Sequence, residues 1–168
     1  NFNAELFPNE IFCLLGHNGA GKTTLIKMLS GIEDPDNGDI FLNGSSIITN
    51  KRYLYQNIGL CQQEDIFFEH LTVEEHLVLM CEIKGERSNL NEITDLIRRI
   101  DLMEKRHCQC STLSGGQKRK LCIALALIGN SNIVLLDEPS SGMDVIAKKA
   151  LWEFLKYYKK NKILILTT

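Results

Sequence analysis

The stretch Gly16-His17-Asn18-Gly19-Ala20-Gly21-Lys22-Thr23 decides the fold, because it matches the pattern G-x-x-x-x-G-K-[ST] in full. It follows the apolar run Ile11-Phe-Cys-Leu-Leu15, which is typical of a buried parallel strand. Residues 22–30 then carry apolar side chains at helical spacing, and Gly31 suits the end of a helix. A strand, a glycine-rich turn and a helix in this order predict a loop that wraps around a phosphate group.

The residue types in this loop fit the chemistry of a triphosphate. Glycines let backbone N–H groups turn inward around an anion, and the start of the helix adds the positive end of its dipole. Lys22 can reach the β- and γ-phosphates, the Thr23 hydroxyl can ligate Mg²⁺, and Thr24 can donate a further hydrogen bond. We therefore predict a nucleotide site made of Gly16, His17, Asn18, Gly19, Ala20, Gly21, Lys22, Thr23 and Thr24.

A second motif stands where another apolar run ends. Residues 132–136 read Asn-Ile-Val-Leu-Leu and predict a buried strand, and Asp137 and Glu138 follow it directly. Asp137 would hold the Mg²⁺ shell, and Glu138 would polarise an attacking water. Alone, an Asp-Glu pair after a strand also fits a strand end without chemistry. The phosphate loop earlier in the chain makes the catalytic interpretation the stronger one.

The third motif is Leu113-Ser114-Gly115-Gly116-Gln117, which predicts a helix running to about Ile128. Ser114 can cap this helix and also donate its hydroxyl to a phosphate. The two glycines leave N–H groups at the helix start free to meet an anion. Taken by itself, a Ser-Gly-Gly sequence would be an ordinary helix start.

The remaining patterns organise the chain. Strands are expected at residues 39–42, 57–61 and 163–166, and helices at residues 73–83, 91–100 and 144–158. Thr72 and Glu75 form a capping box before the first of these helices. An α/β segment, an all-helical stretch and a second α/β segment follow one another. We therefore predict an α/β fold, with a mostly parallel core made of residues 1–63 and 125–168 and an inserted helical subdomain at residues 64–124.

With its LSGGQ sequence between a phosphate loop and LLDEP, the chain resembles the ABC ATPases, and nearly all of it follows their motif order. The resemblance implies a P-loop NTPase core that binds ATP and Mg²⁺. It implies that two cassettes pair head to tail, so that Ser114, Gly115, Gly116 and Gln117 contact the ATP held by the partner. Residues 141–144, Ser-Gly-Met-Asp, resemble the D-loop that crosses this interface.

Gln63 resembles the Q-loop glutamine, which contacts Mg²⁺ and the reactive water and faces the membrane subunit. Gln62 stands where many members of the family have proline, so the register could also fall on Gln62. The resemblance implies an ATP hydrolase in which Glu138, Lys22 and Gln63 are catalytic. Thr23, Gln63 and Asp137 would be the metal ligands.

Several stretches resemble the A subfamily of eukaryotic ABC transporters, namely residues 16–24, Leu71-Thr-Val-Glu-Glu-His-Leu77, Lys118-Arg-Lys-Leu121 and Ser141-Gly-Met-Asp144. This resemblance implies a multi-pass membrane parent with the cassette on its cytosolic side, and a lipid as one transported substrate class. The alternative function is a non-transporter ABC ATPase acting in translation or DNA maintenance. The chain does not begin with Met and ends at Thr168, before the family's switch histidine, so we expect a segment of a longer protein.

Composition sets the remaining expectations. A net charge of −2 gives no long-range attraction to nucleic acid, and we expect no nucleic-acid partner. We expect the basic clusters 118–120, 148–149 and 159–160 to be solvated helix surfaces. Cys13, Cys61 and Cys122 lie in apolar stretches and read as core residues, whereas Cys108 and Cys110 have no second pair of ligands at metal-site spacing. No apolar run is long enough to cross a bilayer.

Overall fold

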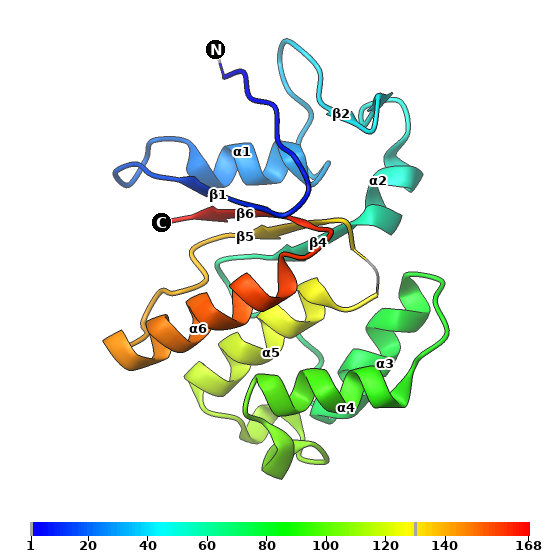
Figure 1. Cartoon of the computed structure of the whole chain (residues 1–168), viewed down its shortest axis with the longest axis vertical. Helices are drawn as coiled ribbons and strands as arrows, with labels where there is room; N and C mark the ends of the chain where they lie inside the picture. Colours follow the sequence, from blue (N-terminus) through cyan, green and yellow to red (C-terminus); the bar gives the residue numbers. More distant parts are fainter. Residues whose placement is uncertain (1, 130) are drawn as a thin grey trace.

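The computed structural model describes residues 2–129 and 131–168, and its centre is a four-stranded parallel sheet (Figure 1). The strand order is β1-β6-β5-β4. The strands are β1 (Glu10–Leu14), β4 (Ile58–Cys61), β5 (Ile133–Leu136) and β6 (Ile163–Thr167). All pairings are parallel, so the carboxyl ends of the strands, where the phosphate loop and Asp137 follow, meet at one edge.

Helices cover both faces of this sheet. Helix α1 (Lys22–Leu29) lies on one face, and α5 (Gly115–Leu127) and α6 (Val145–Tyr158) lie on the other, as Figure 1 shows. Helices α3 (Val73–Ile83) and α4 (Leu90–Arg99) pack beyond α5, with two 3₁₀ turns at Met103–Lys105 and Cys110–Thr112. The predicted α/β class and parallel sheet are confirmed, and each predicted helix lies within about one residue of its place.

Two local features differ from the prediction. Residues 39–42 were expected to form one strand, but the structure has a short antiparallel pair, β2 (Phe41–Leu42) with β3 (Ser45–Ser46). Helix α2 (Lys51–Asn57) was not predicted, and the strand expected from Asn57 begins at Ile58. This helix shows almost no periodicity, because Leu54 is its one buried residue, and its start depends on Asn50, whose side chain accepts from Tyr53 N–H.

Helix α5 is apolar on two sides. Leu121, Ala124, Leu125 and Ile128 pack into a cluster with α3 and α4. Cys122, Ile123, Ala126 and Leu127 pack into another cluster with the sheet and α6. The predicted boundary between residues 124 and 125 therefore falls inside one continuous helix, and the division into a core and a helical subdomain stays a prediction.

Gly59 allows α5 to lie directly on the sheet. A Cβ added at Gly59 in β4 would lie 1.7 Å from the carbonyl oxygen of Ala126. Real Cβ atoms do not approach backbone this closely, so a larger residue would force helix and strand apart. Arg119, a polar residue about two turns earlier in the same helix, lies beside the ends of β4 and β5.

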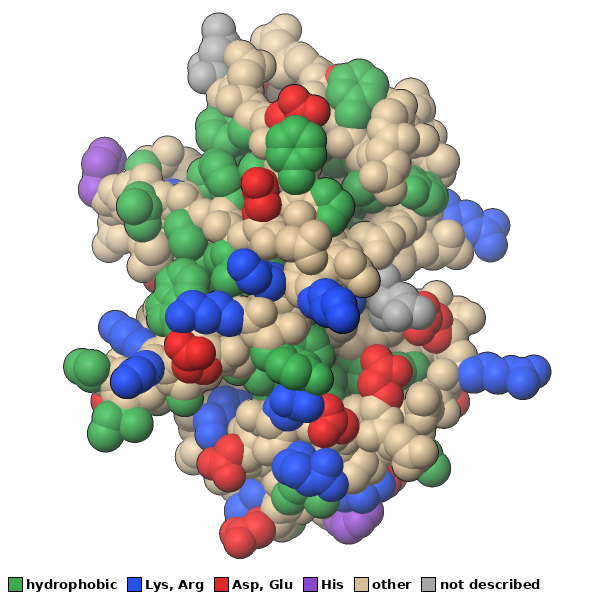
Figure 2. Space-filling model, viewed as in Figure 1, with side chains coloured by type: hydrophobic (Ala, Val, Ile, Leu, Met, Phe, Trp, Pro, Cys, Tyr) green, Lys and Arg blue, Asp and Glu red, His purple; other side chains and the backbone are tan. Residues whose placement is uncertain are grey.

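The surface carries both signs of charge. On the face seen in Figure 2, basic side chains are interspersed with acidic ones over the helical part. The clusters 148–149 and 159–160 are exposed or half-buried, as predicted. Cys61 and Cys122 are buried, and Cys13 is half-buried. Within the two described ranges, the helices are too short or too polar to traverse a bilayer.

Candidate nucleotide-binding site

The phosphate loop connects β1 to α1 and is open to solvent. Residues 16–21 are all exposed, and Gly19 and Gly21 have positive φ angles of 81° and 88°, which most L-residues avoid. The Lys22 ammonium bends back over the loop and donates to the carbonyl oxygens of Gly16 at 2.7 Å and His17 at 3.4 Å. The predicted residues Gly16 to Thr24 thus form one continuous segment, made of an exposed loop and the first turn of α1.

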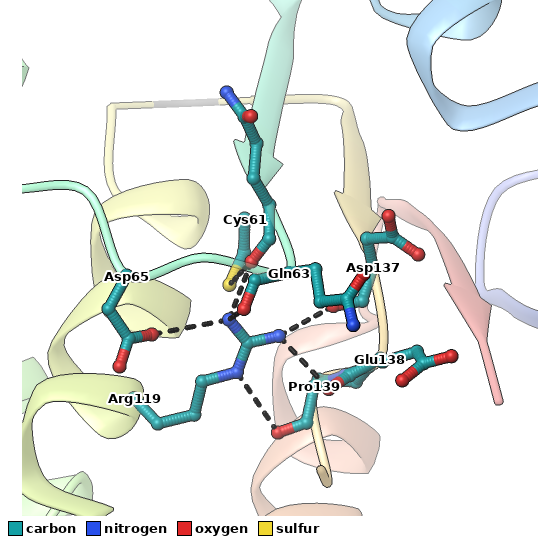
Figure 3. A network of polar contacts seen from close by, with 8 residues as sticks. Cys61, Gln63, Asp65, Arg119, Asp137, Glu138 and Pro139 are labelled. Atoms are coloured by element: carbon teal, nitrogen blue, oxygen red, sulfur yellow. Dashed lines mark hydrogen bonds and ion pairs between the residues drawn. The ribbon is translucent and has the colours of Figure 1, made fainter. Parts of the chain in front are cut away.

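A cleft beside this loop brings the predicted metal ligands together. Its volume is about 260 Å³, and Thr23, Gln63 and Asp137 all line it. Their hydroxyl, amide and carboxylate oxygens are the hard donors that Mg²⁺ prefers, so the residues present fit this ion. Gln62 also lines the cleft. Figure 3 shows the Gln63 side chain directed toward Asp137, which favours Gln63 as the ligand.

Asp137 is held by the neighbouring strand. Its side chain is 2% exposed, and the Thr167 hydroxyl at the end of β6 donates to Asp137 Oδ1 at 2.5 Å. The same hydroxyl accepts from the Glu138 N–H at 2.8 Å. Glu138 has a φ of 46°, a left-handed conformation that is uncommon outside glycine and occurs at functional sites. Thr167 therefore fixes both residues of the predicted acidic pair, and sequence reasoning missed it.

The signature motif begins α5 as predicted. Ser114 Oγ accepts from the Gln117 N–H at 3.4 Å, and Gln117 Oε1 accepts from the Ser114 N–H at 2.9 Å, which completes a capping box. Ser114, Gly115 and Gly116 are exposed, and no heavy atom lies within 4 Å of a Cβ built at either glycine. Figure 1 places the start of α5 well away from the phosphate loop, so one chain does not bring the two segments predicted to bind phosphate together.

Arg119 is the site residue whose exposure the sequence analysis misjudged. The cluster 118–120 was expected to be solvated, but Arg119 is 6% exposed, so for this residue the prediction was wrong. Arg119 lies three and four positions before Cys122 and Ile123, on the face of α5 that packs against the sheet. That spacing is the signal that could have revealed its burial.

Among the residues that the structure describes, Cys110 belongs to no group of three or more His, Cys, Asp or Glu side chains that could hold a metal ion. It is buried, and its sulfur lies 3.3 Å from Nδ1 of His76. His76 Nε2 accepts from the Phe68 N–H at 2.8 Å, so this histidine fastens the segment between β4 and α3. Burial lowers the pKa of His76, and its neutral form supplies the acceptor.

Comparison with known proteins supports the arrangement described above. A model of the ABC transporter family matches residues 1–141. ABC transporter A family member 2 of Dictyostelium discoideum is 42% identical over 98% of this chain and 10% of its own length. The phospholipid-transporting ATPase ABCA3 of Homo sapiens is 40% identical over the whole of this chain and 10% of its own length. The chain thus spans about a tenth of these curated relatives.

Solved structures agree with the sequence matches. The structure of an ATP-binding subunit of an ABC transporter superposes with a TM-score of 0.84 and 30% sequence identity, over 96% of this chain and 69% of that one. The family match covers most of the chain, residues 1–141. The chain therefore belongs to the ABC transporter family, as its ATP-binding cassette.

Proposed function

We propose that this chain is the ATP-hydrolysing cassette of a membrane transporter. The observation that carries the proposal is the single cleft lined by Thr23, Gln63 and Asp137, beside the Lys22 loop. These residues come from three separate segments of the chain. A loop with only a structural role does not require oxygen ligands for a hard cation beside a segment suited to binding an anion.

In the proposed reaction the chain positions ATP and water. Loop amides and Lys22 bind the triphosphate, with Lys22 exchanging its carbonyl partners for phosphate oxygens. Mg²⁺ held by Thr23, Gln63 and Asp137 would offset charge on the phosphates. Glu138 orients the water for in-line attack on the γ-phosphate. Because phosphoryl transfer depends chiefly on positioning and electrostatics, a buried and braced Asp137 suits it.

The complete site requires a second cassette. Ser114, Gly115 and Gly116 are exposed at the start of α5, and the phosphate loop of their own chain does not face them. We propose that they contact ATP bound to the phosphate loop of a partner cassette in a head-to-tail pair. ATP would then join the two surfaces, and hydrolysis would separate them.

The other proposed partner is a set of transmembrane domains. A cavity of about 740 Å³ opens between the sheet and α3, and its lining includes Tyr55 and Ile83, which are 52% and 67% exposed. These apolar side chains suit helices of the parent protein, which in the relatives is about ten times longer than this chain. We propose a phospholipid as the substrate class, because relatives at about 40% identity are named phospholipid-transporting ATPases.

The test is Glu138→Gln in the parent protein reconstituted in lipid bilayers. The variant should bind Mg-ATP and retain it in a closed pair, because the amide keeps the shape of the glutamate but cannot take part in activating water. Turnover should fall by a factor of about 100 or more. ATP turnover and retention of labelled nucleotide would be measured together. Turnover near that of the unchanged protein would contradict the role of Glu138.

A further inference from the structure

The guanidinium of Arg119 forms a buried junction between two loops of the site (Figure 3). It contacts six oxygen atoms, which belong to Gln62, Gln63, Asp65, Asp137, Glu138 and Pro139. We call this set of residues the Arg119 junction. Its members come from α5, from the segment after β4 and from the turn after β5, so three parts of the chain meet at one side chain.

The fork of the guanidinium is divided between the two loops. One terminal nitrogen donates to Gln62 O at 2.5 Å and Gln63 O at 3.3 Å. The other donates to Asp137 O at 2.5 Å and Glu138 O at 3.0 Å. A planar group with donors on both sides fixes the distance between the loops, which a lysine ammonium at a single point cannot do.

Arg119 lies just beyond the point where the backbone hydrogen bonds between β4 and β5 end. Strands β4 and β5 are paired up to Cys61 and Leu136, and the Asp137 N–H donates to Cys61 O at 2.8 Å. Beyond this point the two segments separate and enclose the cleft with Gln63 and Asp137. Arg119 bridges them there, so it sets the separation of these two predicted metal ligands.

The contacts leave the reactive groups free. In the turn after β5, Arg119 donates only to backbone oxygens, and its carboxylate partner is Asp65 at 3.3 Å. The carboxylates of Asp137 and Glu138 are therefore not neutralised by this cation and stay available for metal and water. Such an arrangement positions the site without taking part in its chemistry.

Helix α5 also connects the Arg119 junction to the signature motif. The same helix carries Ser114–Gly116 at its exposed start and Arg119 one turn later. We propose that Arg119 is a positioning residue that holds the Gln63 loop against the Asp137–Glu138 turn and ties their geometry to the helix that meets the partner's ATP. This inference rests on the proposed function, because it assigns Arg119 a role in the same metal site.

The decisive experiment titrates Mg²⁺ at saturating ATP in the reconstituted parent protein carrying Arg119→Lys, and it follows both turnover and the Mg²⁺-dependent retention of labelled nucleotide. This variant keeps the charge but loses the fork. We expect the half-saturating Mg²⁺ concentration to rise about tenfold, as for loss of other groups that orient metal ligands. Maximal turnover should fall by a factor of about 10 to 100, because a small displacement of the ligands is enough. Lys120→Met is the matched control, since Lys120 is the next residue and pairs with the exposed Asp101.

A merely structural role gives a different result. Partial unfolding would lower the number of active molecules but would leave the half-saturating Mg²⁺ concentration unchanged, and that outcome would overturn the inference. In a double-mutant cycle with Gln63→Ala, the two losses in turnover should be far from multiplicative if Arg119 acts through Gln63. Multiplicative losses would also overturn it.

Two further arms keep the test decisive. If Arg119→Lys does not fold, Asp65→Asn loosens the guanidinium while preserving the shape of its partner, and it should shift the Mg²⁺ titration in the same direction by a smaller factor. An unshifted titration in a folded Asp65→Asn protein would count against the inference. If the unchanged protein shows no Mg²⁺-dependent turnover, the proposed function fails before Arg119 is tested.

Discussion

The phosphate loop and the Arg119 junction serve one cleft but are built in opposite ways. The loop is exposed, and its cation Lys22 bonds to carbonyls five and six positions earlier in its own segment. The junction is buried, and Arg119 reaches residues as many as 57 positions away. The loop can therefore exchange its partners for a ligand with little structural cost. The junction combines structural and functional roles, so changes there should affect stability and activity together.

Replacing Lys22 should give the largest effect and would separate activity from stability. We expect Lys22→Met to lower ATP turnover by a factor of about 100 or more, because the main cation of the phosphate cradle is lost. The thermal unfolding midpoint in the absence of nucleotide should stay unchanged, since the ammonium is anchored only to its own exposed loop. ATPase assays and a thermal melt measure both. A large drop in the midpoint would show that Lys22 also stabilises the fold, so that the phosphate loop and the Arg119 junction would not differ in this respect.

Removing the Arg119 guanidinium, unlike replacing Lys22, should clearly lower the stability of the fold. We expect Arg119→Met to lower the free energy of unfolding by about 2–4 kcal/mol, because buried carbonyls and the Asp65 carboxylate lose their donors. Denaturant unfolding of the purified protein measures this change. Lys118→Met, a half-buried neighbour on the same helix, is the control and should change it by less. Equal effects of the two substitutions would show that burial of Arg119 contributes little.

Thr167→Val tests whether Thr167, which holds Asp137 and Glu138, belongs to the same positioning network as the Arg119 junction. Valine has the same shape but leaves Asp137 Oδ1 and the Glu138 N–H without the hydroxyl. We expect a loss of about 1–3 kcal/mol in the free energy of unfolding, together with weaker activation by Mg²⁺. Thr168→Val, at an exposed neighbouring position, is the control. An unchanged Mg²⁺ titration would restrict the positioning network to Arg119.

The smallest expected effect is a change in the free energy of unfolding with pH. It concerns His76, which binds Phe68 in the segment that follows Gln63. Burial lowers the pKa of His76, so below about 6.5 the unfolded chain binds a proton that the folded chain resists. The free energy of unfolding should therefore fall as the pH drops below that value. The loss is on the order of 1 kcal/mol, because the protonated ring cannot accept from Phe68 N–H. In His76→Gln, unfolding measurements should lose this dependence; its persistence would point to another group.

The difference between the phosphate loop, which is a local motif, and the Arg119 junction, which joins distant residues, also explains which parts of the site the sequence could predict. The phosphate loop, the Asp137–Glu138 pair and the Ser114 cap are contiguous motifs whose local geometry follows from glycines, a strand end and a capping residue, and the structure has each element in its predicted place. Arg119 and Thr167 could not be assigned in this way, because their partners are distant in sequence. The burial of Arg119 was visible in helical spacing, but its six acceptors depend on how β4 and β5 end.

The apolar cover on both sides of α5 has a consequence for the dynamics of the domain. A helix enclosed by two clusters cannot loosen unless both open, so its backbone amides should exchange with solvent deuterium more slowly than those of α4. Its first turn, by contrast, is exposed at Gly115 and Gly116 and should exchange early. Because the rest of the helix is enclosed on both sides, α5 should move as one piece, and any displacement of the helix as a whole would carry Arg119 with it.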